Sequence, residues 1–183
     1  MKRCVILMLI VVVGMAASAS AFDGARKGFV LGGGLGFAPV AKYDWPLWEE
    51  NRSGFALNLV IGHAWDEFNM IVYEGNVTSF SSGRGSVTFA QGFNGACWYH
   101  YFGPTGKSFY TAAGLGFYVF RGENAWGYEF QNDPGFGILV GTGYEFARHW
   151  QVGAYLSAGK TDAGLGVEMD HSHFSILVSS IAF

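Results

Sequence analysis

The final stretch of the chain, residues 171–183, reads HSHFSILVSSIAF and contains no Lys, Arg, Asp or Glu. It is long enough for one tilted membrane-crossing β-strand, which needs roughly 9–11 residues. The chain also stops on an aromatic residue, Phe183. In a closed membrane barrel, the last strand pairs with the first and so removes both sheet edges. We expect the terminal aromatic of such a strand at the lipid–water boundary.

Seven earlier segments alternate large apolar residues with small or polar ones, which is the period of a strand with two different faces. These predicted strands cover residues 28–39, 55–65, 68–80, 87–102, 109–121, 135–146 and 150–159. Together with the final stretch they make eight. The sequence therefore predicts an all-β fold, an eight-stranded antiparallel up-and-down transmembrane β-barrel.

The predicted connections alternate between short turns and longer segments. The longer ones cover residues 41–52, 122–133 and 160–170, with a medium one at 81–86, and all four fall at the same end of the barrel. Outer-membrane barrels have long extracellular loops and short periplasmic turns. This asymmetry indicates that the protein lies in the cell outer membrane.

Aromatic residues gather near both ends of the predicted strands. Near the short turns lie Trp65, Phe68, Tyr99, Tyr101, Phe102, Phe109, Tyr144, Phe146 and Trp150, and near the opposite ends lie Phe37, Phe55, Phe80, Phe117, Phe120 and Phe136. Lipid selects for two such belts, because aromatic rings suit a boundary that is apolar on one side and wet on the other. The belts and the loop lengths agree on one topology.

The beginning of the chain has the pattern of a secretory signal. Residues 1–21 combine basic Lys2 and Arg3 with an apolar run and end in Ala-Ser-Ala. Such a segment is cleaved, which leaves residues 22–183 as a single barrel domain.

Charge and cysteine content exclude several classes of protein. The 11 basic and 14 acidic residues give a formal charge of −3, which argues against a nucleic-acid partner. Without residues 1–21, Cys97 is the lone cysteine, so neither an internal disulfide nor a cysteine metal cluster is expected. The 28 glycines, beside 17 Phe, 9 Tyr and 6 Trp, suit a tightly curved sheet.

The alternation also predicts which side chains enter the barrel. Glu74 and Glu145 are expected inside, with Arg121 or Arg148 as candidate ion-pair partners, because buried charges persist when they are paired. In residues 87–102 the pattern points Cys97 to lipid and places Asn94, Trp98 and His100 inside. Phe174 is a further candidate lumen filler. A narrow apolar cavity remains open as an alternative if these side chains leave space.

The chain from residue 22 onward resembles the small eight-stranded outer-membrane barrels of the OmpA/OmpX type. The resemblance rests on the signal, the alternating strands, the loop asymmetry, Gly-Tyr-Glu-Phe at 143–146 and the terminal Phe183. It implies that the outer-membrane assembly machinery reads the closing strand through Phe183 and Ile181. One departure is that Ser175 and Ser179 stand where the family usually has apolar residues. Such barrels host adhesion, structural and enzymatic roles, so the resemblance says little about activity.

Two motifs in the last part of the chain suggest chemistry. His173 and Ser175 have the His-x-Ser spacing of lipid A deacylases, with His173 as base, Ser175 as nucleophile and Glu74 or Glu145 as a candidate carboxylate. The cluster Glu168, Asp170, His171 and His173 has ligand types for a divalent cation, and a hydrophilic loop is the simpler interpretation.

The sequence favours a non-enzymatic protein with a structural or surface-interaction role, and it predicts no catalytic residue, cofactor or metal. The expected partners are outer-membrane lipid and the assembly machinery, and no surface partner is named by the sequence. The alternatives are a lipid A deacylase-like enzyme using His173 and Ser175, or a secreted soluble barrel that binds an apolar ligand. The soluble barrel would need polar outer faces, whereas most predicted outer faces are apolar.

Overall fold

The structure, a computed structural model, describes residues 26–45, 48–81, 87–123, 126–164 and 166–183. The predicted signal at residues 1–21 lies outside the described residues. The described part of the chain contains no helix long and apolar enough to cross a membrane.

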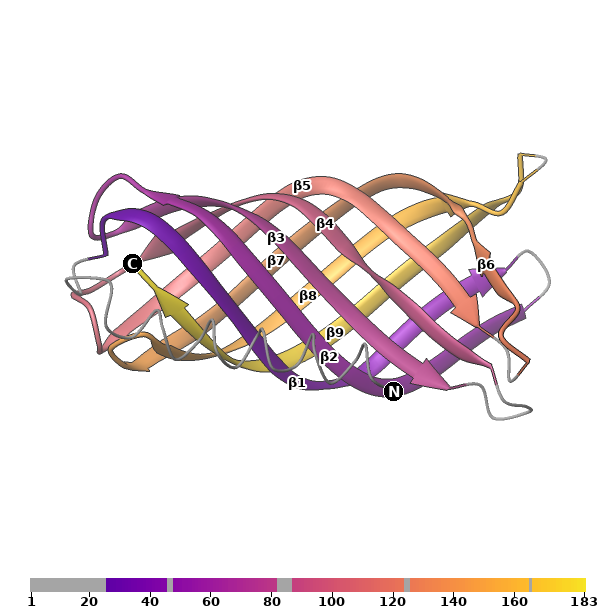
Figure 1. The fold of residues 1–183 in the computed structure, drawn as a ribbon, viewed down its shortest axis with the longest axis horizontal. Helices are drawn as coiled ribbons and strands as arrows, with labels where there is room; N and C mark the ends of the chain where they lie inside the picture. The colour runs from indigo at the N-terminus through magenta and orange to yellow at the C-terminus, as the bar shows by residue number, and fades with distance from the viewer. Residues whose placement is uncertain (1–25, 46–47, 82–86, 124–125, 165) are drawn as a thin grey trace.

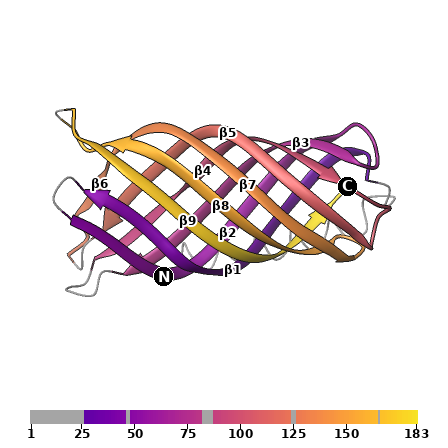
Figure 2. The same ribbon diagram turned by 180° about the vertical axis from the view of Figure 1, so that it is seen from behind.

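Eight long strands and one short strand form a single antiparallel sheet (Figures 1 and 2). Their bounds are β1 Gly28–Trp45, β2 Trp48–Ala64, β3 Asn69–Ser81, β4 Thr88–Tyr101, β5 Ser108–Glu123, β6 Glu129–Gln131, β7 Asp133–Ala147, β8 Trp150–Asp162 and β9 Glu168–Ala182. The long strands pair in chain order, β5 pairs directly with β7, and β6 adds to the final residues of β5. The predicted fold, a closed eight-stranded antiparallel β-barrel, is confirmed.

Closure of the barrel depends on pairing between β1 and β9. The register runs from Leu31 opposite Ala182 to Asp44 opposite Asp170, with one shift between Phe37 and Val40. The last strand therefore pairs with the first, as predicted. Neither strand is left with an open edge, which a lipid environment requires.

The barrel has a turn end and a loop end. At the turn end, the chain reverses at residues 65–68, 102–107 and 148–149. In the first of these turns, the Asp66 carboxylate accepts hydrogen bonds from the backbone N–H groups of Phe68 and Asn69, each at 2.7 Å. The Asn69 side-chain amide lowers the pKa of Asp66 below its usual range. The four remaining connections lie at the opposite, loop end.

The strands continue further toward the loop end than the sequence pattern indicated. β1 and β2 have 18 and 17 residues, and Ala41 pairs with Arg52 inside the segment that was predicted to be a connection. The predicted connections 122–133 and 160–170 likewise contain β6 and the ends of β7, β8 and β9. Ladder hydrogen bonds satisfy the backbone whether or not the side chains are apolar, so the apolar pattern ends before the strands do.

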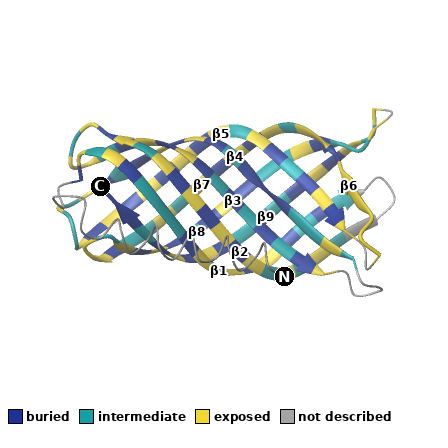
Figure 3. Cartoon of the chain, in the orientation of Figure 1, coloured by how far each residue is buried: buried dark blue, intermediate teal, exposed yellow. Residues whose placement is uncertain are grey.

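Exposed and buried residues alternate along the strands (Figure 3), and large apolar side chains make up much of the exposed outer face. Among the exposed side chains are Leu35 at 57%, Leu59 at 53%, Leu115 at 65% and Phe136 at 64% exposure, while their strand neighbours are mostly buried. The outward faces predicted for β1, β2, β5, β7 and β8 are thus correct. A soluble barrel would have to expose these apolar side chains to water, so the pattern favours lipid over the soluble alternative.

The facing predicted for β4 is wrong. Cys97 is buried and pairs with the inward-facing Val72, whereas Trp98 is 49% exposed on the outer face. Asn94 also lies on the outer face, where its side-chain oxygen accepts a hydrogen bond from the Tyr73 hydroxyl at 3.4 Å. The same alternation turns His100 outward and brings Phe93, Tyr99 and Tyr101 inside. The pattern was misleading because tyrosines are apolar over most of their surface yet can hydrogen-bond in a polar lumen.

Two belts of outward aromatic residues encircle the barrel. The belt at the turn end contains Trp65, Phe68, Trp98, Phe102, Phe109, Phe146 and Trp150, and the belt toward the loop end contains Phe37, Phe55, Phe117 and Phe136. At roughly 3.3 Å per residue and a tilt of about 40°, they lie about 25 Å apart, which is the height of an outer-membrane apolar band. Four residues predicted in the belts, Tyr99, Tyr101, Phe80 and Phe120, are buried inside instead.

The terminal residue does not lie at the lipid boundary, which corrects the prediction for Phe183. Its ring is 2% exposed and packs on His149 with 4.8 Å between ring centroids. The odd-numbered residues of β9 point into the barrel, and Phe183 continues their direction beyond the end of the strand. The same register explains the departure at Ser175 and Ser179, because both serines face the lumen and lipid contacts even-numbered residues such as Ile176.

Candidate functional site

The interior of the barrel is the first place to look for chemistry, because it gathers the buried polar groups. These are Asn58, Glu74, Asn76, Thr78, Gln91, Gln151, Ser157, Thr161, His171, His173, Ser175 and Ser179. Buried tyrosines fill the space between them, and the hydroxyls of Tyr110 and Tyr155 are 2.7 Å apart. Eight strands enclose little more than side chains, so this lumen is a packed polar core.

Glu74 lies at the centre of this core, as predicted. Its carboxylate accepts a hydrogen bond from the Tyr99 hydroxyl at 2.6 Å and weaker ones from Asn58 and Asn76, both at 3.4 Å. A buried carboxyl group is tolerated when hydrogen bonds replace its lost water. These three hydrogen bonds are therefore enough to explain why the Glu74 carboxyl group can be buried.

Glu145 closes the lumen at the turn end, and its partner is one that the sequence analysis missed. Arg26 forms a buried ion pair with Glu145 and donates a hydrogen bond to the backbone oxygen of Glu67. Its guanidinium also stacks on Tyr101, 3.5 Å from the ring centroid. The two predicted partners, Arg121 and Arg148, are both exposed. Arg26 precedes the first strand, so alternation carries no information about it.

The structure brings His173 and Ser175 to the same inner face of β9 but does not join them. The ring nitrogens of His173 contact Tyr118 at 2.8 Å, Ser157 at 2.9 Å and Asn76 at 3.0 Å. The Ser175 hydroxyl donates instead to the Asn76 side-chain oxygen at 3.4 Å.

Both residues are fully buried. Neither predicted carboxylate reaches His173, since Glu74 is connected to it through Asn76 and Glu145 is bound to Arg26. A serine nucleophile needs its base within hydrogen-bond reach and a path for the substrate. The hydroxyl at His173 is that of Ser157, so the predicted pair lacks the geometry of a deacylase site.

The predicted metal cluster in the last connection is divided between two faces of β9. Glu168 and Asp170 point outward and lie 2.7 and 3.9 Å from the Lys160 ammonium, whereas His171 and His173 point inward. Within the described residues, no three His, Cys, Asp or Glu side chains are close enough to hold a metal ion. Alternation along a strand separates residues that a loop would have kept together.

An aromatic cluster closes the lumen at the loop end. It consists of Tyr43, Phe80, Phe89 and Phe120, whose neighbouring rings lie 5.5–6.0 Å apart. His171 stacks on Phe120 beneath it at 4.7 Å. Both ends of the lumen are therefore occupied by side chains.

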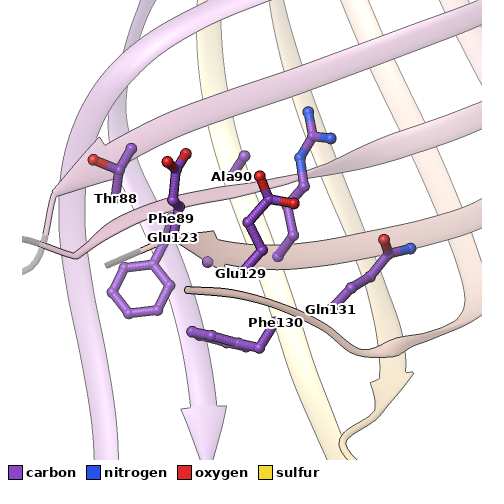
Figure 4. Close-up of a pocket in the computed structure, with 9 residues that line it drawn as sticks. Thr88, Phe89, Ala90, Glu123, Glu129, Phe130 and Gln131 are labelled. Atoms are coloured by element: carbon purple, nitrogen blue, oxygen red, sulfur yellow. The ribbon is translucent and has the colours of Figure 1, made fainter. Parts of the chain in front are cut away.

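The outer rim at the loop end is hollowed where the end of β5 lies between β4 and β6. A groove of about 560 Å³ is lined there by Thr88, Phe89, Ala90, Arg121, Gly122, Glu123, Glu129, Phe130 and Gln131. The rings of Phe89 and Phe130 project to one side, toward the lumen, while the carboxylates of Glu123 and Glu129 project to the other (Figure 4). Unlike the lumen, this groove is open to its surroundings.

Comparison with known proteins identifies the family to which this barrel belongs. The sequence pattern of the outer membrane protein beta-barrel domain matches residues 7–178. The chain belongs to this family. No curated protein sequence matches it.

Two solved structures of outer-membrane barrels have a similar fold. Neisserial surface protein A (NspA) is 14% identical with a TM-score of 0.57, and the match covers 84% of this chain and 96% of NspA. Ail, the attachment invasion locus protein of Yersinia pestis, is 11% identical with a TM-score of 0.54, over 84% of this chain and 99% of Ail. At such identities the likeness concerns the fold alone. The protein is an integral outer-membrane barrel. Because the extracellular loops of such barrels are the longer connections, we expect its loop end to be the extracellular end.

Proposed function

We propose that the protein is a non-catalytic outer-membrane barrel that acts through its extracellular rim. The observation that carries this proposal is the contrast between a packed, hydrogen-bonded lumen and an exposed rim. In the segment before β6, Trp126 is 92% and Tyr128 is 70% exposed, and the groove beside β6 is open. Large aromatic side chains are common anchors of protein interfaces, so the rim offers a surface for a partner.

The charge of the rim selects the kind of partner. Among the loop-end residues whose side chains the structure describes, eight carboxylates accompany four cations; they are Asp44, Glu50, Glu123, Glu129, Asp133, Asp162, Glu168 and Asp170 against Lys42, Arg52, Arg121 and Lys160. The Ail structure contains sucrose octasulfate, a heparin analogue and a polyanion. An acidic rim repels polyanions and attracts a basic partner.

Binding of polyelectrolytes to the barrel in phosphatidylcholine nanodiscs tests this proposal. We expect polylysine to bind, and to bind more weakly as salt increases. The double variant Glu123→Gln/Glu129→Gln should weaken binding by roughly fivefold, whereas Glu67→Gln at the periplasmic end should leave it unchanged. Heparin binding as strong as polylysine binding would contradict the proposal.

The deacylase alternative has its own test. Because His173 and Ser175 are buried and lack a shared hydrogen bond, we expect the acyl chains of lipid A to be the same in cells with the wild type, Ser175→Ala or no protein. Loss of an acyl chain that depends on the wild type and disappears with Ser175→Ala would establish catalysis.

The closing strand is proposed to be the contact with the outer-membrane assembly machinery. The machinery would meet β9 before it pairs with β1, through Ile181 and Phe183 near the end of the chain. Deletion of Phe183 is expected to slow assembly in cells more than it slows refolding into lipid vesicles. Equal slowing in both settings would mean that Phe183 acts only through packing on His149.

A further inference from the structure

Strand β6 has a paired neighbour on one side only. Residues 129–131 pair with the end of β5, and β6 is the last strand in the order of the sheet. On the other side, β8 pairs with β7 as far as Asp162, which lies opposite Asp133, and it does not pair with β6. Among the residues that the structure describes, β6 therefore has an open edge at the loop end of the barrel (Figure 1).

A β-bulge accounts for the end of pairing with β8. The β5 partners of Gly135 and Gln131 have two residues between them, 119 and 120, whereas Gly135 and Gln131 themselves have three, 132–134. One residue is therefore extra, and a bulge of this kind bends its strand. The Asn132 side chain donates a hydrogen bond to a threonine of β8 inside the barrel at 2.8 Å, which holds the bend in place.

The alternation of hydrogen bonds determines which backbone groups the open edge presents. The Asn132 N–H donates to the Phe120 carbonyl oxygen at 3.1 Å. In an antiparallel ladder every second residue bonds to the same neighbour, so Phe130 also bonds toward β5. Glu129 and Gln131 then direct their N–H and C=O groups away from β5. These four groups have no hydrogen-bond partner in the described part of the chain.

Carboxylates surround this edge on the outer side of the barrel. Glu129 lies directly opposite Glu123, and their carboxylates project to the same side (Figure 4). Asp133 lies directly opposite Asp162, where β8 stops pairing. Like charges that face each other across a ladder are destabilising, and Arg121, in the next row of β5, offsets only part of the charge. A strand that brought cations to this edge would relieve the repulsion.

We propose that β6 accepts a basic, extended segment of a partner protein as an added antiparallel strand. This inference rests on the proposed function, a rim that binds a basic partner, and specifies how that partner is held. An open strand edge is a template for pairing with another chain. In strand addition, main-chain hydrogen bonds provide affinity and alternate side chains provide specificity.

The register of such a strand defines the sequence that fits. Residues opposite Glu129 and Gln131 share their outward face, so Lys or Arg at these positions meets the carboxylates. The residue between them lies beside Phe130 on the side that faces the lumen, where an apolar side chain fits. The preferred segment therefore alternates basic and apolar residues.

A second copy of this chain fits the edge less well. Antiparallel pairing of β6 with itself would bring Glu123 and Glu129 of both copies into one patch. Like charges placed across a ladder are destabilising. The charge of the edge therefore favours a basic partner over self-association.

Fluorescence anisotropy of a labelled peptide that alternates Lys and Val, bound to the barrel in phosphatidylcholine nanodiscs, tests strand addition. The Lys residues opposite Glu129 and Gln131 turn their backbone N–H groups toward β6, and the Val residues turn theirs away. N-methylation of the Lys backbone nitrogens should therefore weaken binding by about tenfold. N-methylation of the Val backbone nitrogens is the matched control, with the same charge, and should change binding less than about twofold.

Gln131→Pro makes the corresponding change in the barrel. Proline removes an N–H from the open edge and keeps both glutamates, and edge strands tolerate proline where the N–H faces solvent. This variant should bind the unmethylated peptide about fivefold more weakly, whereas Gln131→Ala, which keeps the N–H, should bind it like the wild type. The heat-dependent gel mobility of each variant reports whether the barrel has folded.

The possible outcomes separate strand addition from the proposed function. Equal binding of the two methylated peptides would overturn strand addition and leave the acidic rim as proposed, because charge would then suffice. Failure of every peptide to bind would reject the proposed function as well. Dimerisation of the barrel in detergent that Gln131→Pro abolishes would assign the edge to a second copy and would also overturn the proposal.

Discussion

At the scale of single residues, the barrel contains one deeply buried ion pair, between Arg26 and Glu145, in its described part. The pair holds the chain before β1 against the turn end of β7, and Gly106 adds a backbone hydrogen bond to the same carboxylate at 2.9 Å. Breaking a buried pair leaves an unmatched charge away from water, which costs more than the pair itself contributes.

Replacement of one partner is therefore expected to be strongly destabilising. Arg26→Ala should lower the free energy of unfolding by roughly 3–5 kcal/mol, because the Glu145 carboxylate would remain buried without its cation. Urea-induced unfolding of the barrel in lipid vesicles measures this change.

Two further variants separate charge from packing in the same measurement. Arg26→Met/Glu145→Gln removes both charges and should recover at least half of the loss. Arg148→Ala, at an exposed arginine of the same end, should have an effect below about 0.5 kcal/mol. An Arg26→Ala barrel as stable as the wild type would show that water reaches Glu145.

At the scale of elements, β4 shows how a strand can be assigned the wrong face. Both of its faces carry large side chains, so hydrophobicity by itself does not distinguish them. Its register with β3 does, because Cys97 lies opposite the buried Val72. The Tyr99 hydroxyl then reaches Glu74 inside the barrel.

The facing of β4 can be measured with thiol reagents, because Cys97 is the lone cysteine in residues 22–183. Cys97 should react with neither a water-soluble nor a lipid-soluble maleimide in the folded barrel, and it should react with both after denaturation. In a Cys97→Ser background, Trp98→Cys should react with the lipid-soluble reagent. Reaction of Cys97 in the folded wild type would restore the outward assignment.

The pairing between β1 and β9, which closes the barrel, leaves little space for added atoms. A methyl group at Gly36 would overlap the carbonyl oxygen of Ile176, whereas at Gly33 the nearest atom is the Asn58 carbonyl oxygen at 3.2 Å. Gly36→Ala should therefore destabilise the barrel by about 3 kcal/mol and Gly33→Ala by clearly less. Refolding yield into vesicles, measured for both variants, tests this order, and equal yields would contradict it.

At the scale of the whole molecule, closure by hydrogen bonds should make the barrel resistant to detergent. We expect the unboiled protein from the membrane fraction to migrate faster on a detergent gel than the boiled protein, because the folded barrel is compact until heated. Recovery in the soluble periplasmic fraction without a mobility shift would contradict the outer-membrane location.

The sequence by itself determined the number of strands, the order of turns and loops, and the apolar faces of most strands. These features are local, because a period of two and a run of turn residues can be read within a few positions. The terminal stretch 171–183 was also correctly predicted to close the sheet on residues 28–39.

Only the tertiary structure decided the rest. The inward turn of Phe183, the facing of β4 and the pairing of Arg26 with Glu145 depend on the register between strands and on contacts between residues far apart in the chain. The division of the Glu168–His173 cluster depends on where β9 begins. A groove on the barrel wall beside Arg121 is formed jointly by residues of β3, β4, β5 and β6. Such features arise when separate strands pair side by side. The alternation of residues within one strand does not indicate which residues of the neighbouring strands it will face.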